Sequence, residues 1–215
     1  MVHNNLTDRL FGSYYNRKCR SFANASQQVV TGQLVLCGDS LTELWAIAGE
    51  KHYPQVGLKV YNRGISADTC IGLIRRLDVS ALVLRPKILV LLIGINDFWR
   101  ANWTAGETLE SQRIIIERLQ REIPDCRIIV ESLYPIHQKC RNPAEPFNGK
   151  VRAVNQELRK MVEKLGCEYL DIHPLLADEH GNMRRELSPD GLHINGRGYE
   201  IVRKAIEAMI GTVVY

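Results

Sequence analysis

The chain has 215 residues and a formal net charge of +4, with 45% hydrophobic and 24% charged residues. This composition is ordinary for a globular protein, and the length suits one domain with a sizeable core, although length alone also allows two small domains. Basic residues are scattered among acidic ones, which argues against a nucleic-acid or membrane-surface role, and no apolar run reaches the roughly 18 residues of a membrane span.

Cysteine and histidine patterns bear on location and cofactors. The six cysteines form no C-x-x-C pair, and residues 1–20 lack the apolar stretch of a secretory signal peptide. We therefore expect reduced, partly buried thiols and a cytoplasmic protein. The histidines show no metal-ligand spacing such as H-E-x-x-H, so no metal is expected, and the chemistry inferred below needs no organic cofactor.

The predicted elements alternate between helices and strands along the chain. Residues 6–25 are expected to form a helix that packs outside the first strand. Short apolar runs predict five buried strands at 33–37, 58–62, 87–93, 127–132 and 168–171. Helical spacing predicts further helices at 108–121, 147–165 and 195–209, and residues 137–148 are expected to form a long loop. This alternation predicts a parallel sheet with helices on both faces, and ligands should bind beyond the carboxyl ends of its strands.

The first predicted strand runs into Gly38, Asp39 and Ser40. A serine there, two residues after a glycine, can lie on a tight turn into a helix, where backbone N–H groups favour developing negative charge. Aspartate or serine at that place is also a common helix N-cap. Taken alone, the triplet favours the N-cap.

Polar residues also follow the second and third predicted strands. Residues 63–69 form a glycine-bearing segment that, alone, favours a capped loop. Asn96 and Asp97 follow the third strand, where the amide of Asn96 could donate to an oxyanion. An Asn-Asp pair is equally good turn chemistry, so this segment leaves both interpretations open.

Near the carboxyl terminus, Asp190 and His193 lie three residues apart, before the last predicted helix. A nucleophilic serine needs a base and a carboxylate that orients the base, and one loop could supply both. An isolated D-x-x-H more often contains an incidental histidine. His173 follows the fifth strand and is a rival base by position, although we expect it to pack at the strand end.

The four segments together resemble a known family. G-D-S at 38–40, N-x-G-I-x-x-D-T at 62–69, G-x-N-D at 94–97 and D-G-L-H at 190–193 are similar, in this order, to the motifs of SGNH hydrolases, also called GDSL esterases or lipases. The resemblance extends from about residue 34 to residue 198. The G-D-S-L at 38–41, the R-L at 76–77 and the R-P-K at 85–87 look most like the branch that contains the catalytic subunits of intracellular platelet-activating-factor acetylhydrolase.

This resemblance implies a fold. It implies a flavodoxin-like three-layer α/β/α sandwich with a five-stranded parallel sheet in the order 2-1-3-4-5. Residues 1–215 would form one such domain, with residues 1–30 as a helical extension that packs on it.

The resemblance also implies a role for each matching residue. Ser40 would be the nucleophile, His193 the general base and Asp190 the carboxylate that orients it. The N–H groups of Ser40 and Ala67 and the side-chain amide of Asn96 would form the oxyanion hole. The family normally has glycine where this chain has Ala67. Alanine supplies the same N–H but resists a positive φ, so strained or altered geometry is expected if the hole needs that conformation.

The expected reaction is hydrolysis of a small-molecule ester through an acyl-enzyme. Trp45, Asp97, Phe98 and Trp99 are candidates for the substrate wall. Packing of these residues in the core, or against a second copy in a homodimer, is about equally expected. No large insertion between the motifs suggests a lid, which favours an open cleft and short acyl groups, such as acetyl on a carbohydrate or another small alcohol.

Two alternatives remain open. One is thioesterase or lysophospholipase activity, which the resemblance also covers. The other is a non-catalytic binding module on a flavodoxin-like sheet. The sequence contains neither G-x-G-x-x-G nor a P-loop, which argues against this alternative.

Overall fold

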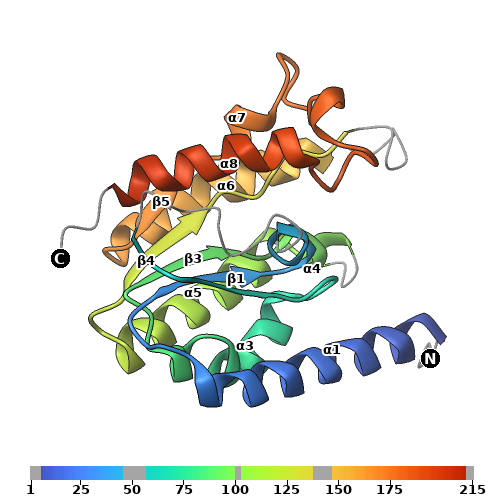
Figure 1. The fold of residues 1–215 in the computed structure, drawn as a ribbon. Coiled ribbons are helices and arrows are strands. Elements are labelled where there is room, and N and C mark those ends of the chain that lie inside the picture. Colours follow the sequence, from blue (N-terminus) through green and yellow to red (C-terminus); the bar gives the residue numbers. More distant parts are fainter. Residues whose placement is uncertain (1–5, 46–56, 100–102, 138–146, 212–215) are drawn as a thin grey trace.

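The computed structural model describes residues 6–45, 57–99, 103–137 and 147–211 (Figure 1). Five strands form one sheet: β1 (Leu34–Gly38), β2 (Val60–Gly64), β3 (Ile88–Leu92), β4 (Arg127–Glu131) and β5 (Glu168–Leu170). All pairs are parallel, and the strand order β2-β1-β3-β4-β5 confirms the predicted fold class and topology.

Helices cover both faces of this sheet. They are α1 (Leu6–Ala25), α2 (Ser40–Glu43), α3 (Cys70–Ser80), α4 (Ile95–Trp99), α5 (Ala105–Glu122), α6 (Phe147–Lys164), α7 (His173–Leu176) and α8 (Gly196–Ile210). Short 3₁₀ turns occur at Ser26–Gln28, Leu82–Leu84 and Arg185–Leu187. The four predicted helices correspond to α1, α5, α6 and α8, whereas the expected loop at 137–148 lies mostly outside the described residues. No helix in the described part of the chain is long and apolar enough to cross a membrane.

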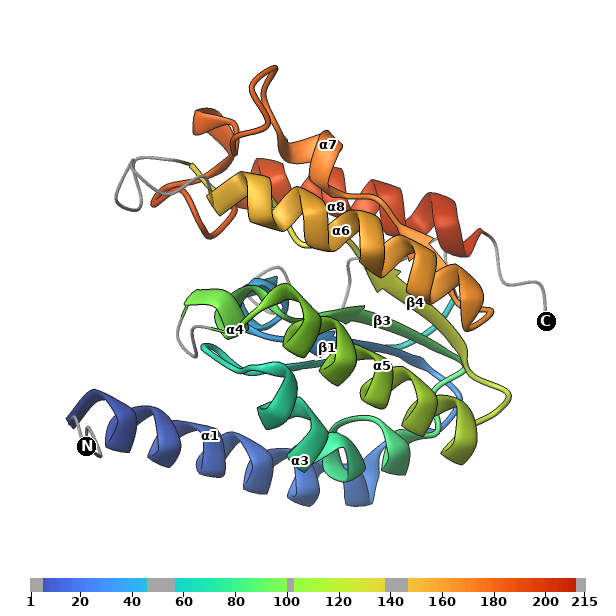
Figure 2. The same cartoon turned by 180° about the vertical axis from the view of Figure 1, so that it is seen from behind.

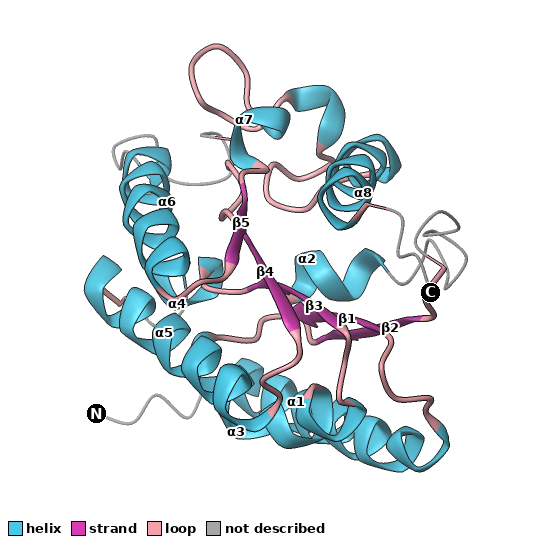
Figure 3. Ribbon diagram, turned by 90° about the vertical axis from the view of Figure 1, so that its left-hand side faces the viewer, coloured by secondary structure: helices cyan, strands magenta, loops and turns pink. Residues whose placement is uncertain are grey.

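The sheet separates two hydrophobic cores because successive strand residues point to opposite faces. On β1, Leu34 and Leu36 face a core that includes residues of α2 and α8, whereas Val35 and Cys37 face a core that includes residues of α3 and α5. The amino-terminal half of α6 packs into the first core and its carboxyl-terminal half into the second. Figure 3 shows the resulting layers, with α2 and α8 on one side of the strands and α3 and α5 on the other.

The amino-terminal helix α1 is helical, as predicted. It runs along α3 (Figures 1 and 2), and its Phe22 ring also lies against the Arg63 guanidinium of β2, 4.7 Å from the ring centroid. The Tyr15 hydroxyl donates to the Gly72 carbonyl at 2.7 Å, which ties α1 to the first turn of α3.

Local sequence determines where several helices begin. Thr104 and Glu107 form a capping box at the start of α5, with the Thr104 side chain accepting from the Glu107 N–H. Asn195 caps α8 by accepting from the Arg197 and Gly198 N–H groups.

The carboxyl ends of β1, β2 and β3 lie in register, since Gly38 is opposite Gly64 on one side and Leu92 on the other. The polar segments that follow these strands therefore meet at one edge of the sheet.

Candidate active site

Ser40 is the first residue of α2, directly after β1. The side chain of Asp39 caps this helix, accepting from the Leu41 N–H at 3.0 Å, so the Ser40 hydroxyl is not used as the cap. A Cβ atom at position 38 would lie 2.2 Å from the Leu92 carbonyl oxygen and from the Thr42 hydroxyl oxygen. Only glycine fits there, and the tight turn that results places Ser40 at a helix N-terminus.

The structure brings Ser40, His193 and Asp190 together across 153 residues of chain. His193 Nε2 lies 3.0 Å from Ser40 Oγ, and His193 Nδ1 lies 2.6 Å from Asp190 Oδ2. The other carboxylate oxygen of Asp190 accepts from the N–H groups of Leu192 and His193, at 2.9 and 2.8 Å. The carboxylate thus fixes both the backbone and the ring of His193, which leaves Nε2 facing the serine.

Hydrogen bonds decide the ionisation of Asp190. Partial burial acts to raise the pKa of Asp190, but the His193 ring and the Leu192 and His193 N–H groups stabilise its charged form. Together they hold the pKa of Asp190 below its ordinary value. Asp190 is therefore a carboxylate at neutral pH, as a group that orients and stabilises a cationic imidazole must be.

Ala67 lies in a tight turn after β2 and adopts the left-handed conformation. The Asp68 N–H donates to the Ile65 carbonyl at 3.1 Å, and Ala67 has φ of +63°. A positive φ at the third position is the signature of a type II turn, which normally takes glycine there. Within the described residues, the N–H groups of Ser40 and Ala67 have no hydrogen-bond acceptor. Both are therefore available to a ligand.

Asn96 connects the three strand ends. Its Nδ2 donates to the Asp68 carbonyl at 3.0 Å and lies 3.5 Å from Asp39 Oδ2. The second contact is too long to be a strong hydrogen bond, so one amide hydrogen is weakly engaged. The Ser40 and Ala67 N–H groups and this amide are the set of donors that an anionic oxygen would need.

Comparison with known proteins shows the family of the chain. Residues 36–201, more than half of the chain, match the model of the GDSL-like lipase/acylhydrolase family. The chain belongs to this family of hydrolases. A Streptococcus pneumonia protein named after platelet activating factor superposes with a TM-score of 0.85 at 22% identity, over 96% of this chain and 97% of that one.

Two further proteins have sequences that match part of this GDSL-like acylhydrolase. Acetylxylan esterase from Geobacillus stearothermophilus is 40% identical over 48 residues, which are 22% of each chain. Its structure superposes with a TM-score of 0.67 at 20% identity, over 86% of this chain and 96% of that one. N-acylneuraminate cytidylyltransferase from Escherichia coli is 20% identical over 178 residues, 82% of this chain. The chain spans only 40% of that cytidylyltransferase and, in its sequence match, 22% of the esterase. The structural likenesses show a shared fold.

Two of the residues proposed as the substrate wall of this acylhydrolase, Asp97 and Phe98, are buried. Asp97 is 0% exposed, and both of its oxygens accept from the Cys70 N–H, at 3.2 and 3.1 Å, at the start of α3. Burial raises the pKa of Asp97 to about 6. Phe98 is buried with its ring edge-on to Phe147, 6.4 Å between centroids. Both residues are buried, which agrees with the alternative expectation of packing in the core.

The other candidates differ in their placement. Trp45 follows α2 and lines a pocket next to His193, as expected of a wall residue. Trp99 ends α4, and its side chain is outside the described part of the structure. His173 is buried at the start of α7, where its N–H donates to Ser132 Oγ at 2.8 Å, and burial lowers its pKa. It packs at the end of β5, as predicted.

One charged residue that the sequence does not mark connects the elements around the site. Glu43, at the end of α2, accepts from the Ser66 N–H at 2.5 Å and from the Tyr14 hydroxyl, and pairs with Lys18 Nζ at 2.8 Å. It thus connects α1, the serine helix and the turn that contains Ala67. No pattern in the sequence marks Glu43, because its partners are 23 to 29 residues away. Among the described residues, no group of three or more His, Cys, Asp or Glu side chains could hold a metal ion.

Proposed function

We propose that this GDSL-like acylhydrolase is a serine carboxylesterase in which Ser40, His193 and Asp190 form the catalytic triad. The observation that supports the proposal is the hydrogen-bonded chain from Asp190 through the His193 ring to Ser40 Oγ, with distances of 2.6 and 3.0 Å. A serine hydroxyl is a weak nucleophile until a base removes its proton, and a base within 3 Å is placed to do so.

The proposed reaction has two steps. In the first, Ser40 Oγ attacks the ester carbonyl carbon while His193 Nε2 takes the hydroxyl proton. The C–O bond to the alcohol then breaks, and His193 returns that proton to the leaving oxygen. In the second step, water attacks the acyl carbon while His193 takes one of its protons. The bond from that carbon to Ser40 Oγ then breaks, His193 returns the proton to Oγ, and the acid is released. Asp190 stabilises the imidazolium that forms in each step.

The proposed oxyanion hole consists of the Ser40 and Ala67 N–H groups and the Asn96 amide. These donors lie at the ends of three neighbouring strands, so they are fixed before substrate arrives. Donors that need no reorganisation stabilise the tetrahedral oxyanion more than the ground-state carbonyl, typically by about 3 kcal/mol each.

We propose esters with short acyl groups, such as acetyl, as substrates. The support for this choice is the similarity to an acetylxylan esterase, which acts on acetylated carbohydrate. A series of p-nitrophenyl esters from acetyl to longer acyl groups, with an acyl-CoA and a lysophospholipid beside it, separates an esterase from a thioesterase or lysophospholipase.

Ser40→Ala tests the proposal. We expect it to lower kcat for p-nitrophenyl acetate by about 10⁴-fold or more and to abolish labelling by a fluorophosphonate, whose phosphorus bonds to Oγ as fluoride leaves. Ser13, exposed on α1, is the matched control: Ser13→Ala should leave rate and labelling unchanged. Circular dichroism checks that both variants fold. If folded Ser40→Ala retained turnover or labelling, Ser40 would not be the nucleophile. If wild type hydrolysed none of the esters, the proposed esterase function would be refuted.

A further inference from the structure

A pocket of about 650 Å³ opens beside His193. It lies between the end of α2 and the first turns of α8. Its lining includes His193 and Asp190 but neither Ala67 nor Asn96. The pocket therefore meets the triad at the imidazole and not at the oxyanion donors.

The direction of proton transfer indicates which half of an ester would enter this pocket. His193 must deliver its proton to the leaving oxygen, so the alcohol lies on the histidine side of the serine, while the carbonyl oxygen points at the oxyanion donors. The histidine side is where the pocket opens. We propose, on the basis of the esterase function above, that this pocket binds the leaving alcohol, and that the alcohol is uncharged and carries a ring-sized apolar face.

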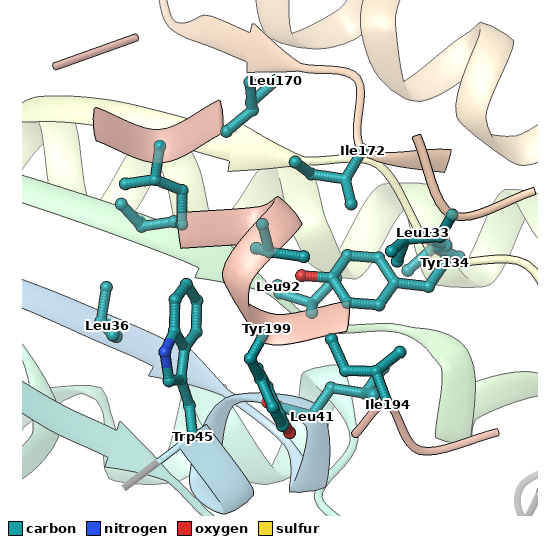
Figure 4. Close-up of a cluster of buried hydrophobic side chains, with 14 of the residues drawn as sticks. Leu36, Leu41, Trp45, Leu92, Leu133, Tyr134, Leu170, Ile172, Ile194 and Tyr199 are labelled. Carbon is teal, nitrogen blue, oxygen red and sulfur yellow. The ribbon is translucent and has the colours of Figure 1, made fainter. Parts of the chain in front are cut away.

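The floor of the pocket is apolar and fixed in place. Trp45 and Tyr199 lie with ring centroids 5.5 Å apart and planes inclined by 33°, and the Tyr199 hydroxyl donates to the Leu41 carbonyl at 3.0 Å. Figure 4 shows these two rings beside one another, with Leu41 and Ile194 against Tyr199. Trp45 and Tyr199 are mostly buried, at 6% and 9% exposed, but both line the pocket. The part that they leave open is a fixed apolar surface, and such a surface packs against the apolar face of a ring.

The rim of the pocket holds a cation that is already neutralised. Arg203 Nε and Nη2 donate to Glu200, at 3.0 and 2.7 Å, and Nη1 donates to Glu207 at 2.6 Å. Lys204 Nζ, just outside the lining, lies 3.6 Å from Glu200. Asp190 adds a further negative charge. A phosphate or carboxylate on the leaving group would meet carboxylates here and no uncommitted cation among the described lining residues, which is why we infer an uncharged alcohol.

Gly196 gives a direct test, because it lines the pocket and a Cβ atom there would meet nothing within 4 Å. Gly196→Leu adds a branched side chain to the pocket lining at the first residue of α8, where the Cβ atom has open space. We expect kcat/KM for benzyl acetate to fall by about tenfold or more relative to kcat/KM for ethyl acetate, whose alcohol is too small to fill the pocket. For each ester, kcat/KM of the variant is divided by kcat/KM of wild type, so that the difference in intrinsic reactivity between the two esters cancels.

Gly106 provides the matched control. It lies in the first turn of α5, a Cβ atom there also meets nothing within 4 Å, and it does not line the pocket. Gly106→Leu should leave both esters unaffected. Equal losses on benzyl acetate in the two variants would mean a general effect of the substitution and would overturn the assignment.

A second series distinguishes the alcohol from the acyl side. With methanol as the constant leaving group, lengthening the acyl chain from acetyl to hexanoyl should change kcat/KM by the same factor in wild type and Gly196→Leu. If the variant instead selectively loses the long acyl chains, the pocket binds the acyl group and the proposal is wrong.

The charge inference has its own comparison. Benzyl acetate and 4-(acetoxymethyl)benzoate share the acyl group and the leaving oxygen and differ by one remote carboxylate. We expect wild type to prefer the neutral ester by about tenfold in kcat/KM. Equal rates, or a preference for the anion, would overturn this part. If wild type hydrolyses none of benzyl acetate, 4-(acetoxymethyl)benzoate and ethyl acetate, the esterase function itself is refuted. This outcome differs from every result expected of the Gly196 variant, because those results all require an active wild type.

Discussion

Arg76 and Asp68 form an ion pair that is sealed inside the protein, with Nε 2.7 Å from Oδ2 and side-chain exposures of 1% and 2%. The rest of the Arg76 guanidinium donates to the carbonyls of Gly38 and Arg63, at 2.9 and 2.7 Å, and to Ser80 Oγ at 2.8 Å. One side chain thus holds the ends of β1 and β2 and the residue that follows Ala67.

Removing one member of this pair leaves a buried charge without a partner. We expect Arg76→Met to lower the free energy of unfolding by about 3–5 kcal/mol, measured by urea denaturation. Arg113, which pairs with Glu110 and Glu117 on the exposed face of α5, is the control, and Arg113→Met should change it by about 0.5 kcal/mol or less. If the two substitutions had similar effects, the buried pair would not be the support that its geometry indicates.

Asn96→Ala should lower kcat for p-nitrophenyl acetate by about 10²–10³-fold and leave KM nearly unchanged, because the amide would donate to an oxygen that is anionic only in the transition state. It also removes the hydrogen bond to the Asp68 carbonyl, so a loss of about 1–3 kcal/mol in stability is expected. The rate is therefore measured at a temperature where a melting curve shows the variant to be folded. An unchanged kcat would remove Asn96 from the oxyanion hole.

Ala67→Gly should preserve activity and raise the free energy of unfolding by up to about 1 kcal/mol, since the left-handed φ of +63° strains alanine but not glycine. The greater freedom of glycine in the unfolded chain limits the gain. Ala67→Val keeps the N–H but places a β-branched residue at positive φ, so it should destabilise by more than Ala67→Gly stabilises. A glycine variant that is less stable than wild type would contradict this account of the turn.

Burial raises the pKa of Glu131 to about 7, and the hydrogen bond from the Tyr134 hydroxyl lowers it by less. The folded chain therefore binds a proton at Glu131 more tightly than the unfolded chain does. Through this group, stability falls as pH rises from about 4.5 to about 7.

Glu131→Gln tests this dependence, because it retains an acceptor for Tyr134 and removes the charge. The variant should exceed wild type by about 1–2 kcal/mol in free energy of unfolding at pH 8, with no such advantage at pH 4. Glu110→Gln, on an exposed helix face, should give no comparable gain at pH 8. A Glu131→Gln difference of the same size at both pH values would show that ionisation of Glu131 is not its source.

The fold followed closely from the sequence. Continuous apolar runs such as 87–93 are long enough for a strand and contain no helical spacing, so β3 could be predicted within a residue or two of its ends. Helix α3 was not predicted, because Gly72 weakens its helical pattern. The structure gives the reason for that glycine: a Cβ atom there would lie 1.8 Å from Asp68 Oδ1.

For the site, the sequence by itself placed Ser40, Ala67, Asn96, Asp190 and His193 after strands or before the last helix, and the parallel sheet then required those segments to converge at one edge. Only the tertiary structure decided that Asp97 and Phe98 turn into the core while Trp45 borders a pocket, and that Arg76 and Glu43 support the turn around Ala67. Periodicity tells which face of an element is buried, because that depends on neighbours along the chain. A polar group such as Glu43 finds its partner at Ser66, 23 positions away, and no local pattern carries that information.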